Sequence, residues 1–353
     1  MKKNRICLNM IVRNEERVIQ RCLDSLKDFI DYWVIVDTGS TDGTQAIIEK
    51  TLKKIPGELH ETSWVDFAHC RNQALDLAKR KGDYVLFIDA DEIFTPGRPK
   101  FIWPPLDKDC YMASFLLENG SIIQRIFLAN AHLEWKWRGA LHEELATDVP
   151  RSGGILEGAL IRVTQDGGRS QDPEKYLKDA KLLEKDLLRD PENSRTLFYL
   201  ALSYEMANAP ELALAAYRKR AKMGGWDEEL YHSLYRIAAL EEQPIGSYCK
   251  AYATRPTRAE PLFMLGNYLI EKNLPFLAYL LATFALRLPL PEDRTFVERE
   301  VYDYKLLTQK ADAATLLGRY GETAALLRES LRSQTMPPDI REKVKVALMR
   351  MSK

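Results

Sequence analysis

Short apolar runs alternate with helical patterns along the first half of the chain. The runs are RICLNMIV at residues 5–12, YWVIV at 32–36 and YVLFI at 84–88. Between them, apolar positions at helical spacing predict helices over about residues 15–27, 44–54 and 67–81. Because strands that alternate with helices normally form a parallel sheet with crossover helices, this half is predicted to be an α/β domain.

Two further extended runs follow, CYMASFLLE at residues 110–118 and SIIQRIFLA at 121–129. They are joined through Asn119 and Gly120, which is a strong signal for a β-hairpin. We therefore expect antiparallel strands to be added to the parallel core, giving a mixed sheet.

The pattern changes near residue 168, and from about residue 172 helices with Ala-rich packing positions replace the strand signals. One group of small and apolar positions follows the spacing of a 34-residue tetratricopeptide repeat: Leu197, Leu200, Ala201, Tyr204, Ala213 and Tyr217. A fainter copy runs through Leu262, Leu265, Gly266, Ala278, Ala282 and Ala285. The alternative is a plain helical bundle in which small residues permit close packing. We place an α/β domain at residues 1–168 and an all-α, repeat-like domain at 169–353.

Composition narrows the class of partner. The 353 residues include 51 Lys and Arg and 51 Asp and Glu, so no overall charge favours nucleic acid or an anionic membrane. The five cysteines contain no CxxC pair, which argues against a disulfide framework or a structural zinc site. No apolar stretch reaches the roughly 18 residues of a membrane span. Charges return at Arg13 after a short N-terminal apolar run, with no cleavage site, so we expect a cytoplasmic protein without a transmembrane segment.

Acidic residues follow a buried-strand pattern in DYVLFIDADEIF, which places Asp89, Asp91 and Glu92 within four positions. Like charges at this spacing repel one another unless a cation lies between them. Carboxylate oxygens suit Mg²⁺ or Mn²⁺, and magnesium commonly completes its shell with substrate phosphates. One alternative is an acidic turn that caps a helix. Another is the nucleophile motif of haloacid-dehalogenase-like phosphatases, with Asp89 as nucleophile, although that motif opens its domain and here two strand-helix units precede it.

Three polar loops leave the predicted strand ends: RNEE at residues 13–16, DTGSTDGT at 37–44 and DADE at 89–92. Ligands of open α/β sheets bind outside the carboxyl ends of the strands, so these loops are expected to share one site. Asp37 directly follows an apolar run, and a glycine-containing loop of this kind suits a ribose or a base edge. The sequence has neither GxGxxG nor a GK[ST] phosphate loop, which argues against the usual nicotinamide and ATP sites.

The blocks NMIVRNEE, VIVDTGSTDGT, FAHCRNQALDLAKRKGDYVLFIDADE and RGALHEEL stand in this order over about residues 4–146. Together they resemble a family 2 glycosyltransferase with the GT-A fold. The helical half is similar to the tetratricopeptide-like extension of some bacterial members, among them peptide S-glycosyltransferases. The HE block is also similar to lipopolysaccharide-core glucosyltransferases.

The resemblance implies a metal-dependent, inverting transfer of a sugar from a nucleotide-sugar donor, with a uridine diphosphate sugar expected, to a protein or peptide acceptor. A saccharide or lipid-linked acceptor is one alternative. A non-catalytic helical-repeat adaptor with a degenerate glycosyltransferase domain is another. The resemblance also implies a homodimer.

The same resemblance implies roles for individual residues. Nucleotide contacts are expected from Arg13, Glu15, Asp37, Arg71 and Asp89. Ligands to Mn²⁺ or Mg²⁺ are expected from Asp91, Asp89 and His142. Glu143 is expected to be the catalytic base and His142 a metal ligand or phosphate contact, with the two roles open to exchange. The family usually carries its acidic base in a later ED-type block, and no such block stands out here.

Four further residues keep two interpretations each. Trp135 and Trp137 form either a platform on which the acceptor stacks or part of the core. Arg125 and Arg138 either supply positive charge to the diphosphate or form surface ion pairs.

Overall fold

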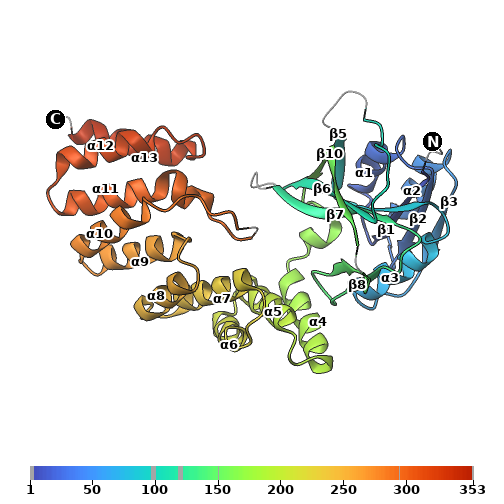
Figure 1. Ribbon diagram of the computed structural model, residues 1–353, viewed down its shortest axis with the longest axis horizontal. Coiled ribbons are helices and arrows are strands. Elements are labelled where there is room, and N and C mark those ends of the chain that lie inside the picture. Colours follow the sequence, from blue (N-terminus) through green and yellow to red (C-terminus); the bar gives the residue numbers. More distant parts are fainter. Residues whose placement is uncertain (1–3, 97–100, 118–121, 150, 294, 352–353) are drawn as a thin grey trace. The chain divides into compact units, whose positions relative to one another are not determined.

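The structure is a computed structural model that describes residues 4–96, 101–117, 122–149, 151–293 and 295–351. The chain divides into two compact units, Met1–Pro191 and Glu192–Lys353 (Figure 1). The sequence analysis placed the domain boundary at residue 168, whereas the compact units divide after residue 191. The physical reason is that the segment after residue 167 packs on the first unit: Gly168 N donates to Glu15 Oε2 at 3.0 Å, and the Arg169 guanidinium lies 4.5 Å from the Phe67 ring centre.

The first unit is built on an eight-stranded mixed sheet with the strand order β3-β2-β1-β4-β7-β6-β10-β5. Its strands are β1 (Ile6–Val12), β2 (Tyr32–Asp37), β3 (Gly57–Glu61), β4 (Tyr84–Phe87), β5 (Glu92–Pro96), β6 (Cys110–Leu116), β7 (Ile122–Asn130) and β10 (Gly153–Val163). Strands β1 to β4 are parallel to one another, which confirms the predicted core. Strand β7 runs antiparallel to both β4 and β6. The antiparallel pairing of β6 and β7 confirms the predicted additions, while Asn119 and Gly120 lie outside the described residues.

Three strands of the eight-stranded sheet escaped the sequence analysis. β3 carries the sequence GELHE and β5 the sequence EIFTP, and neither shows a continuous apolar run. Both lie at the edges of the sheet, where a strand needs fewer apolar residues because less of it is covered. β10 interrupts its apolar positions with glycines and charges, and its register against β6 shifts between Ile155 and Leu160.

Helices cover both faces of the sheet (Figure 1). α1 (Ile19–Leu26) and α2 (Thr44–Leu52) pack with one set of alternating strand residues, including Ile6, Leu8 and Met10. α3 (Phe67–Ala78) packs with the opposite set, which includes Cys7 and Val34. This two-faced burial explains why the central strands are almost continuously apolar.

The three helices lie where the periodicity predicted them, with differences at their ends. α1 begins at Ile19 instead of near residue 15, because the residues before it form a turn in which Glu15 O accepts from Val18 N at 3.0 Å and from Ile19 N at 2.9 Å. The remaining elements of the unit are β8 (Lys136–Arg138), β9 (Glu144–Ala146), the short helix η1 (Gly168–Gln171) and α4 (Lys175–Arg189).

The second unit is all-helical throughout its described residues, as predicted. Its helices are α5 (Ser194–Met206), α6 (Pro210–Arg220), α7 (Asp227–Leu240), α8 (Ile245–Thr254), α9 (Glu260–Glu271), α10 (Pro275–Ala285), η2 (Val301–Lys305), α11 (Leu306–Leu316), α12 (Tyr320–Ser330) and α13 (Pro338–Met351). The helices follow one another as consecutive pairs, and α5, α7 and α9 start at equal intervals close to the tetratricopeptide period. The fold is therefore tetratricopeptide-like.

The small residues singled out in the sequence do allow close packing. Ala201, Ala213, Ala278, Ala282 and Ala285 are completely buried. Gly266 on α9 faces Gln309 of α11, and a Cβ at Gly266 would stand 2.6 Å from the Gln309 Oε1 atom. A glycine at this position lets the two helices approach.

A longer connection between α10 and α11 packs against the earlier helices of the same unit. The Phe296 ring stacks on His232 of α7 at 4.0 Å between ring centres. Arg258, almost fully buried, donates to Asp293 Oδ2 at 2.9 Å and to the Phe296 carbonyl at 2.5 Å. Part of the surface of α7 is therefore covered by the chain itself.

Of the described helices, none has both the length and the apolar character that crossing a membrane requires.

Candidate active site

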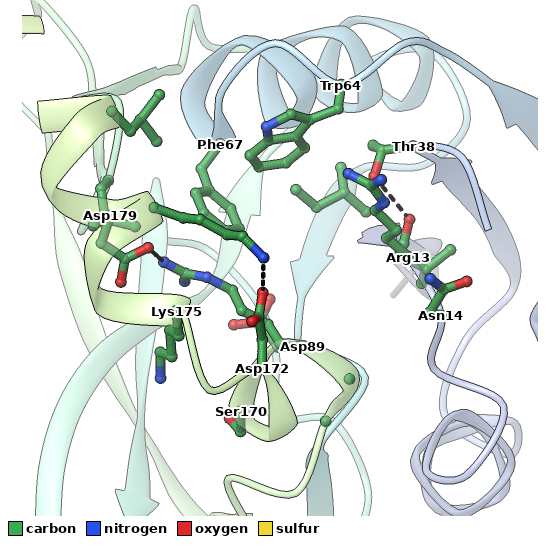
Figure 2. A pocket seen from close by; sticks show the side chains of 18 of the residues that line it. Arg13, Asn14, Thr38, Trp64, Phe67, Asp89, Ser170, Asp172, Lys175 and Asp179 are labelled. Carbon is green, nitrogen blue, oxygen red and sulfur yellow. Dashed lines mark hydrogen bonds and ion pairs between the residues drawn. The ribbon is translucent and has the colours of Figure 1, made fainter. Parts of the chain in front are cut away.

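A cavity of about 1000 Å³ lies at the carboxyl ends of β1, β2 and β4. The loops after all three strands line it, so the structure brings together the three polar loops noted in the sequence. The residues named from the sequence that line the cavity are Arg13, Glu15, Arg71, Asp89, Asp91, His142 and Glu143. Figure 2 shows Arg13, Asn14 and Thr38 on one side of it, Asp89 at the centre and Asp179 on the far side.

Arg71 links the acidic strand end to the HE block. Its Nη2 lies 2.6 Å from Asp89 Oδ1, and its Nε lies 2.5 Å from Glu143 Oε1. Burial alone would lower the pKa of Arg71, but the two carboxylates raise it, so the guanidinium stays charged. Burial would likewise raise the pKa of Asp89, and the charges of Arg71 and Arg125 outweigh it and lower that pKa. One buried cation thus holds two carboxylates in place.

Local structure explains why these groups meet. Asp66 precedes α3, and its side chain caps the helix by accepting from His69 N at 2.7 Å, which places Arg71 on the second turn. The neighbouring Asn72 side chain pairs with the backbone of Trp137, accepting from its N at 2.8 Å and donating to its O at 2.9 Å. The chain leading to Glu143 is therefore tied to α3.

His142 has a positive φ of 53°. This conformation is uncommon for a residue with a side chain, and it is found more often at functional turns than elsewhere. Gly139, with φ at 95°, provides another such position three residues earlier. The turn directs both His142 and Glu143 to the cavity.

Glu15 and Asp91 approach the same point from two loops. A Cβ built on Gly167 would stand 3.0 Å from Glu15 Oε2 and 3.2 Å from Asp91 Oδ2. Burial raises the pKa of Glu15 to about 7, and the charges of Asp91 and Asp89 add to the effect. Burial and the neighbouring Asp89 charge also raise the pKa of Asp91. The surroundings of the two carboxylates therefore disfavour their charged forms.

These carboxylates bear on the expected metal. Within the ranges that the structure describes, no three His, Cys, Asp or Glu side chains are gathered into a ready metal cluster. The donor set still fits a hard divalent cation, because Glu15 and Asp91 present oxygen ligands at one point and repel each other without a cation. Asp89 is engaged by Arg71, which leaves Asp91 better placed to bind metal.

Asp37 lies at the end of β2 and is absent from the residues that line the cavity. Its Oδ1 accepts from Gly39 N at 2.8 Å and from Ser40 N at 2.6 Å, so it holds the loop that follows. Its Oδ2 is buried and has no hydrogen-bond partner within the part of the chain that the structure describes. The neighbouring Thr38 reaches the cavity instead.

Glu92 and Arg125 form a second ion pair behind the acidic loop. Arg125 Nη1 lies 2.7 Å from Glu92 Oε1, and Arg125 Nη2 lies 3.7 Å from Asp89 Oδ2. Glu92 Oε2 also accepts from Asp89 N at 2.9 Å. Burial raises the pKa of Glu92 to about 7 despite Arg125. Both residues act on the site through Asp89, because neither lines the cavity.

The two tryptophans and Arg138 have structural partners. Trp135 is buried, and Trp137 packs edge-on against Phe87 at 5.3 Å and beneath Arg71. Arg138 forms a surface ion pair with Asp148. The aromatic groups that line the cavity are Trp64 and Phe67, whose rings lie 4.7 Å apart (Figure 2).

The sequence analysis also missed the wall formed after β10. Gly167, Gly168, Arg169 and several lysines of α4 line the cavity. The adjacent glycines that follow β10, Gly167 and Gly168, were the available signal, since a Cβ at Gly168 would stand 2.4 Å from the Asn14 carbonyl oxygen. Close approach of this kind requires glycine.

Comparison with known proteins adds an independent finding. Residues 7–138 match the sequence model of the family described as Glycosyl transferase family 2. Glycosyltransferase SunS of Bacillus phage SPbeta is 26% identical over 228 residues, which cover 61% of this chain and 52% of that protein. A TPR repeat-containing protein of Synechococcus elongatus is 46% identical over 88 residues, 25% of this chain and 20% of that protein. The chain thus spans about half or less of these relatives' own lengths.

Among solved structures, S. aureus TarS 1-349 matches with a TM-score of 0.36 and 15% identity, over 79% of this chain and 91% of that one.

Proposed function

We propose, from the glycosyl transferase family 2 domain that residues 7–138 carry, that the protein is a metal-dependent inverting glycosyltransferase with a nucleotide-sugar donor. The observation that supports this most is that the loops after β1, β2 and β4 and the HE block line one cavity. We further propose a uridine diphosphate sugar as donor and a protein or peptide as acceptor.

In this proposal the donor binds at the sheet edge. The loop of Arg13 and Asn14 and the loop held by Asp37 receive the nucleoside. Asp91, with Asp89 and Glu15 beside it, would hold Mn²⁺ or Mg²⁺, and His142 lines the same cavity. When bound, such a cation neutralises the charge of the leaving nucleoside diphosphate.

Glu143 is proposed as the base. In direct displacement, the bond from the acceptor atom to the anomeric carbon forms while the bond from that carbon to the diphosphate oxygen breaks. The acceptor atom loses its proton to a positioned base in the same step. Arg71 engages Oε1 of Glu143 and fixes its orientation, so Oε2 is the proposed proton acceptor. Glu143 then carries the proton taken from the acceptor, and the nucleoside diphosphate is the leaving group.

A peptide acceptor is proposed because stacked helical pairs offer extended surfaces suited to peptides. The connection between α10 and α11 already covers part of α7. Within the second unit, we therefore assign acceptor contacts to helical surfaces that this connection does not cover.

Calorimetric titration tests the donor part of the proposal. UDP, GDP, CDP and TDP are titrated into the protein with and without Mn²⁺, and the measurement is repeated on Asp91→Asn. Asp76→Asn is the matched control, because Asp76 lies on the exposed side of α3 with 70% of its side chain accessible. We expect metal-dependent binding of UDP that is lost in Asp91→Asn and kept in Asp76→Asn. Absence of binding for every nucleotide would refute the proposal and favour the helical adaptor.

A further inference from the structure

Helix α4 directs a row of lysines to the cavity. Lys175, Lys178, Lys181 and Lys185 all line it, and we call these four residues the α4 lysine row. From Lys175 to Lys185 the helix rises about 15 Å, at 1.5 Å for each residue. The row therefore extends well beyond the reach of a single diphosphate group.

Ion pairs among the described residues take up little of the positive charge in this row. Lys178 Nζ lies 2.7 Å from Asp172 Oδ2 and 3.4 Å from Glu174 Oε2. Within the described ranges, Lys175, Lys181 and Lys185 have no ion-pair partner. Burial lowers the pKa of Lys175 and the charge of Arg169 adds to this, whereas the charges of Asp179 and Asp91 act in the opposite direction. A cation in this position is stabilised by an anion that binds next to it.

The carboxylates proposed to serve the donor and the lysines of α4 belong to different walls of the cavity. The carboxylates of Glu15, Asp89 and Asp91 gather at the sheet edge, where the donor and its metal are proposed to bind. The lysines occupy the wall formed by α4, and Figure 2 shows Lys175 and Asp179 on this helix across from Trp64. We therefore expect one ligand group at the sheet edge and a second, anionic group at the wall formed by α4.

The wall is mixed in character and not uniformly basic. Leu182 and Val65 line the cavity as well, and so do the carboxylates of Asp172 and Asp179. Apolar side chains give contact area to the side chains of a peptide, and carboxylates accept hydrogen bonds from peptide N–H groups. A phosphate polymer has no apolar groups to place against Leu182 and Val65.

We propose that the α4 lysine row is an acceptor subsite that binds an acidic segment of a peptide chain. The inference rests on the proposed glycosyltransferase function and adds the chemical class of the acceptor. The carboxylates of the segment lie along the lysines, which brings the acceptor atom toward Glu143.

Fluorescence anisotropy with a labelled hexaglutamate peptide tests this, and labelled polyphosphate serves as the comparison probe. The variant is Lys181→Glu with Lys185→Glu, because both side chains are exposed and reversal leaves the core intact. The matched control is Lys50→Glu with Lys53→Glu, two exposed positions at the end of α2 outside the cavity. We expect the first variant to lose hexaglutamate affinity by about tenfold or more and the control to change by less than about twofold.

Nucleotide titration in the presence of Mn²⁺ separates this inference from the function on which it rests. We expect both double variants to bind the nucleoside diphosphate as the unmodified protein does. A parallel loss of nucleotide binding in Lys181→Glu with Lys185→Glu would assign the row to the donor and overturn the inference. Binding of polyphosphate without hexaglutamate would also overturn it, as would equal losses in variant and control. Failure of the unmodified protein to bind any nucleoside diphosphate would instead refute the proposed function.

Discussion

Replacing Arg71 by methionine removes the cation that Asp89 and Glu143 share. The Arg71 side chain is 11% exposed and that of Glu143 10%, so water solvates little of either charge. Removing one partner of a buried ion pair costs about 3–5 kcal/mol. Asp89 is 33% exposed, and water offsets part of its loss. We therefore expect a cost near the lower end, about 3 kcal/mol.

Thermal unfolding followed by circular dichroism measures this cost. For a unit of this size, about 3 kcal/mol corresponds to a decrease of roughly 6–12 °C in the Tm of its transition. Arg80→Met is the control, because Arg80 is exposed just after α3, and we expect it to change stability by less than about 0.5 kcal/mol. The double variant Arg71→Met with Glu143→Gln removes one of the stranded charges, so it should recover part of the lost Tm.

The same pair gives a pH dependence. The folded-state pKa of Asp89 lies below its ordinary value of 3.8, so its stabilisation is present above that value and disappears as the pH falls through the folded-state pKa. The Tm difference between the unmodified protein and Arg71→Met should therefore be largest near neutral pH and narrow in acid. An Arg71→Met Tm equal to that of Arg80→Met, with no recovery from Glu143→Gln, would refute the reasoning.

Three further outcomes are expected. Gly168→Ala places a Cβ 2.4 Å from the Asn14 carbonyl oxygen and should cost about 1–3 kcal/mol in urea unfolding, whereas Gly246→Ala, with open space around it, should be close to neutral. The folded-state pKa of Glu15 is about 7, against an ordinary value of 4.5, so the stabilisation by its protonated form is lost as the pH rises through 7. Glutamine does not titrate, so between pH 5 and pH 8 the Tm of Glu15→Gln should rise relative to the Tm of the unmodified protein. An unchanged Tm difference would contradict this. Arg258→Met leaves buried Glu260 without its cation, while Asp293 keeps its ion pair with Arg255. It should destabilise the second unit by about 3–5 kcal/mol, a loss that exposed Arg287→Met should not reproduce.

Local patterns carried much of the prediction. Continuous apolar runs located β1, β2 and β4, because strands buried on both faces need apolar side chains at nearly every position. Helical periodicity located α1, α2 and α3 to within a few residues. Acidic residues directly after β4 marked the sheet edge at which the cavity lies. Signals of this kind depend on residues that are close together in the sequence, so they can be recognised without knowledge of the fold.

Edge strands and helix pairs without strong periodicity were harder to predict. β3 and β5 carry too few apolar residues to stand out, because each is covered by a neighbour on only one side. The pair α7 and α8 lacks the small-residue spacing that revealed its neighbours, and it is placed by buried Tyr231, Tyr235 and Tyr248 instead.

The sequence by itself determined the two-part architecture, the parallel core and the types of residue available at the strand ends. Tertiary structure alone decided which of these residues meet. Arg71 joins Asp89 to Glu143 across 18 and 72 positions of the chain, and Gly168 reaches Glu15 across 153. In the sequence, the lysines of α4 look like the solvated face of an ordinary helix, and only the fold shows that they line a cavity. Charge pairing and burial depend on distance in space, and a linear pattern does not contain that distance.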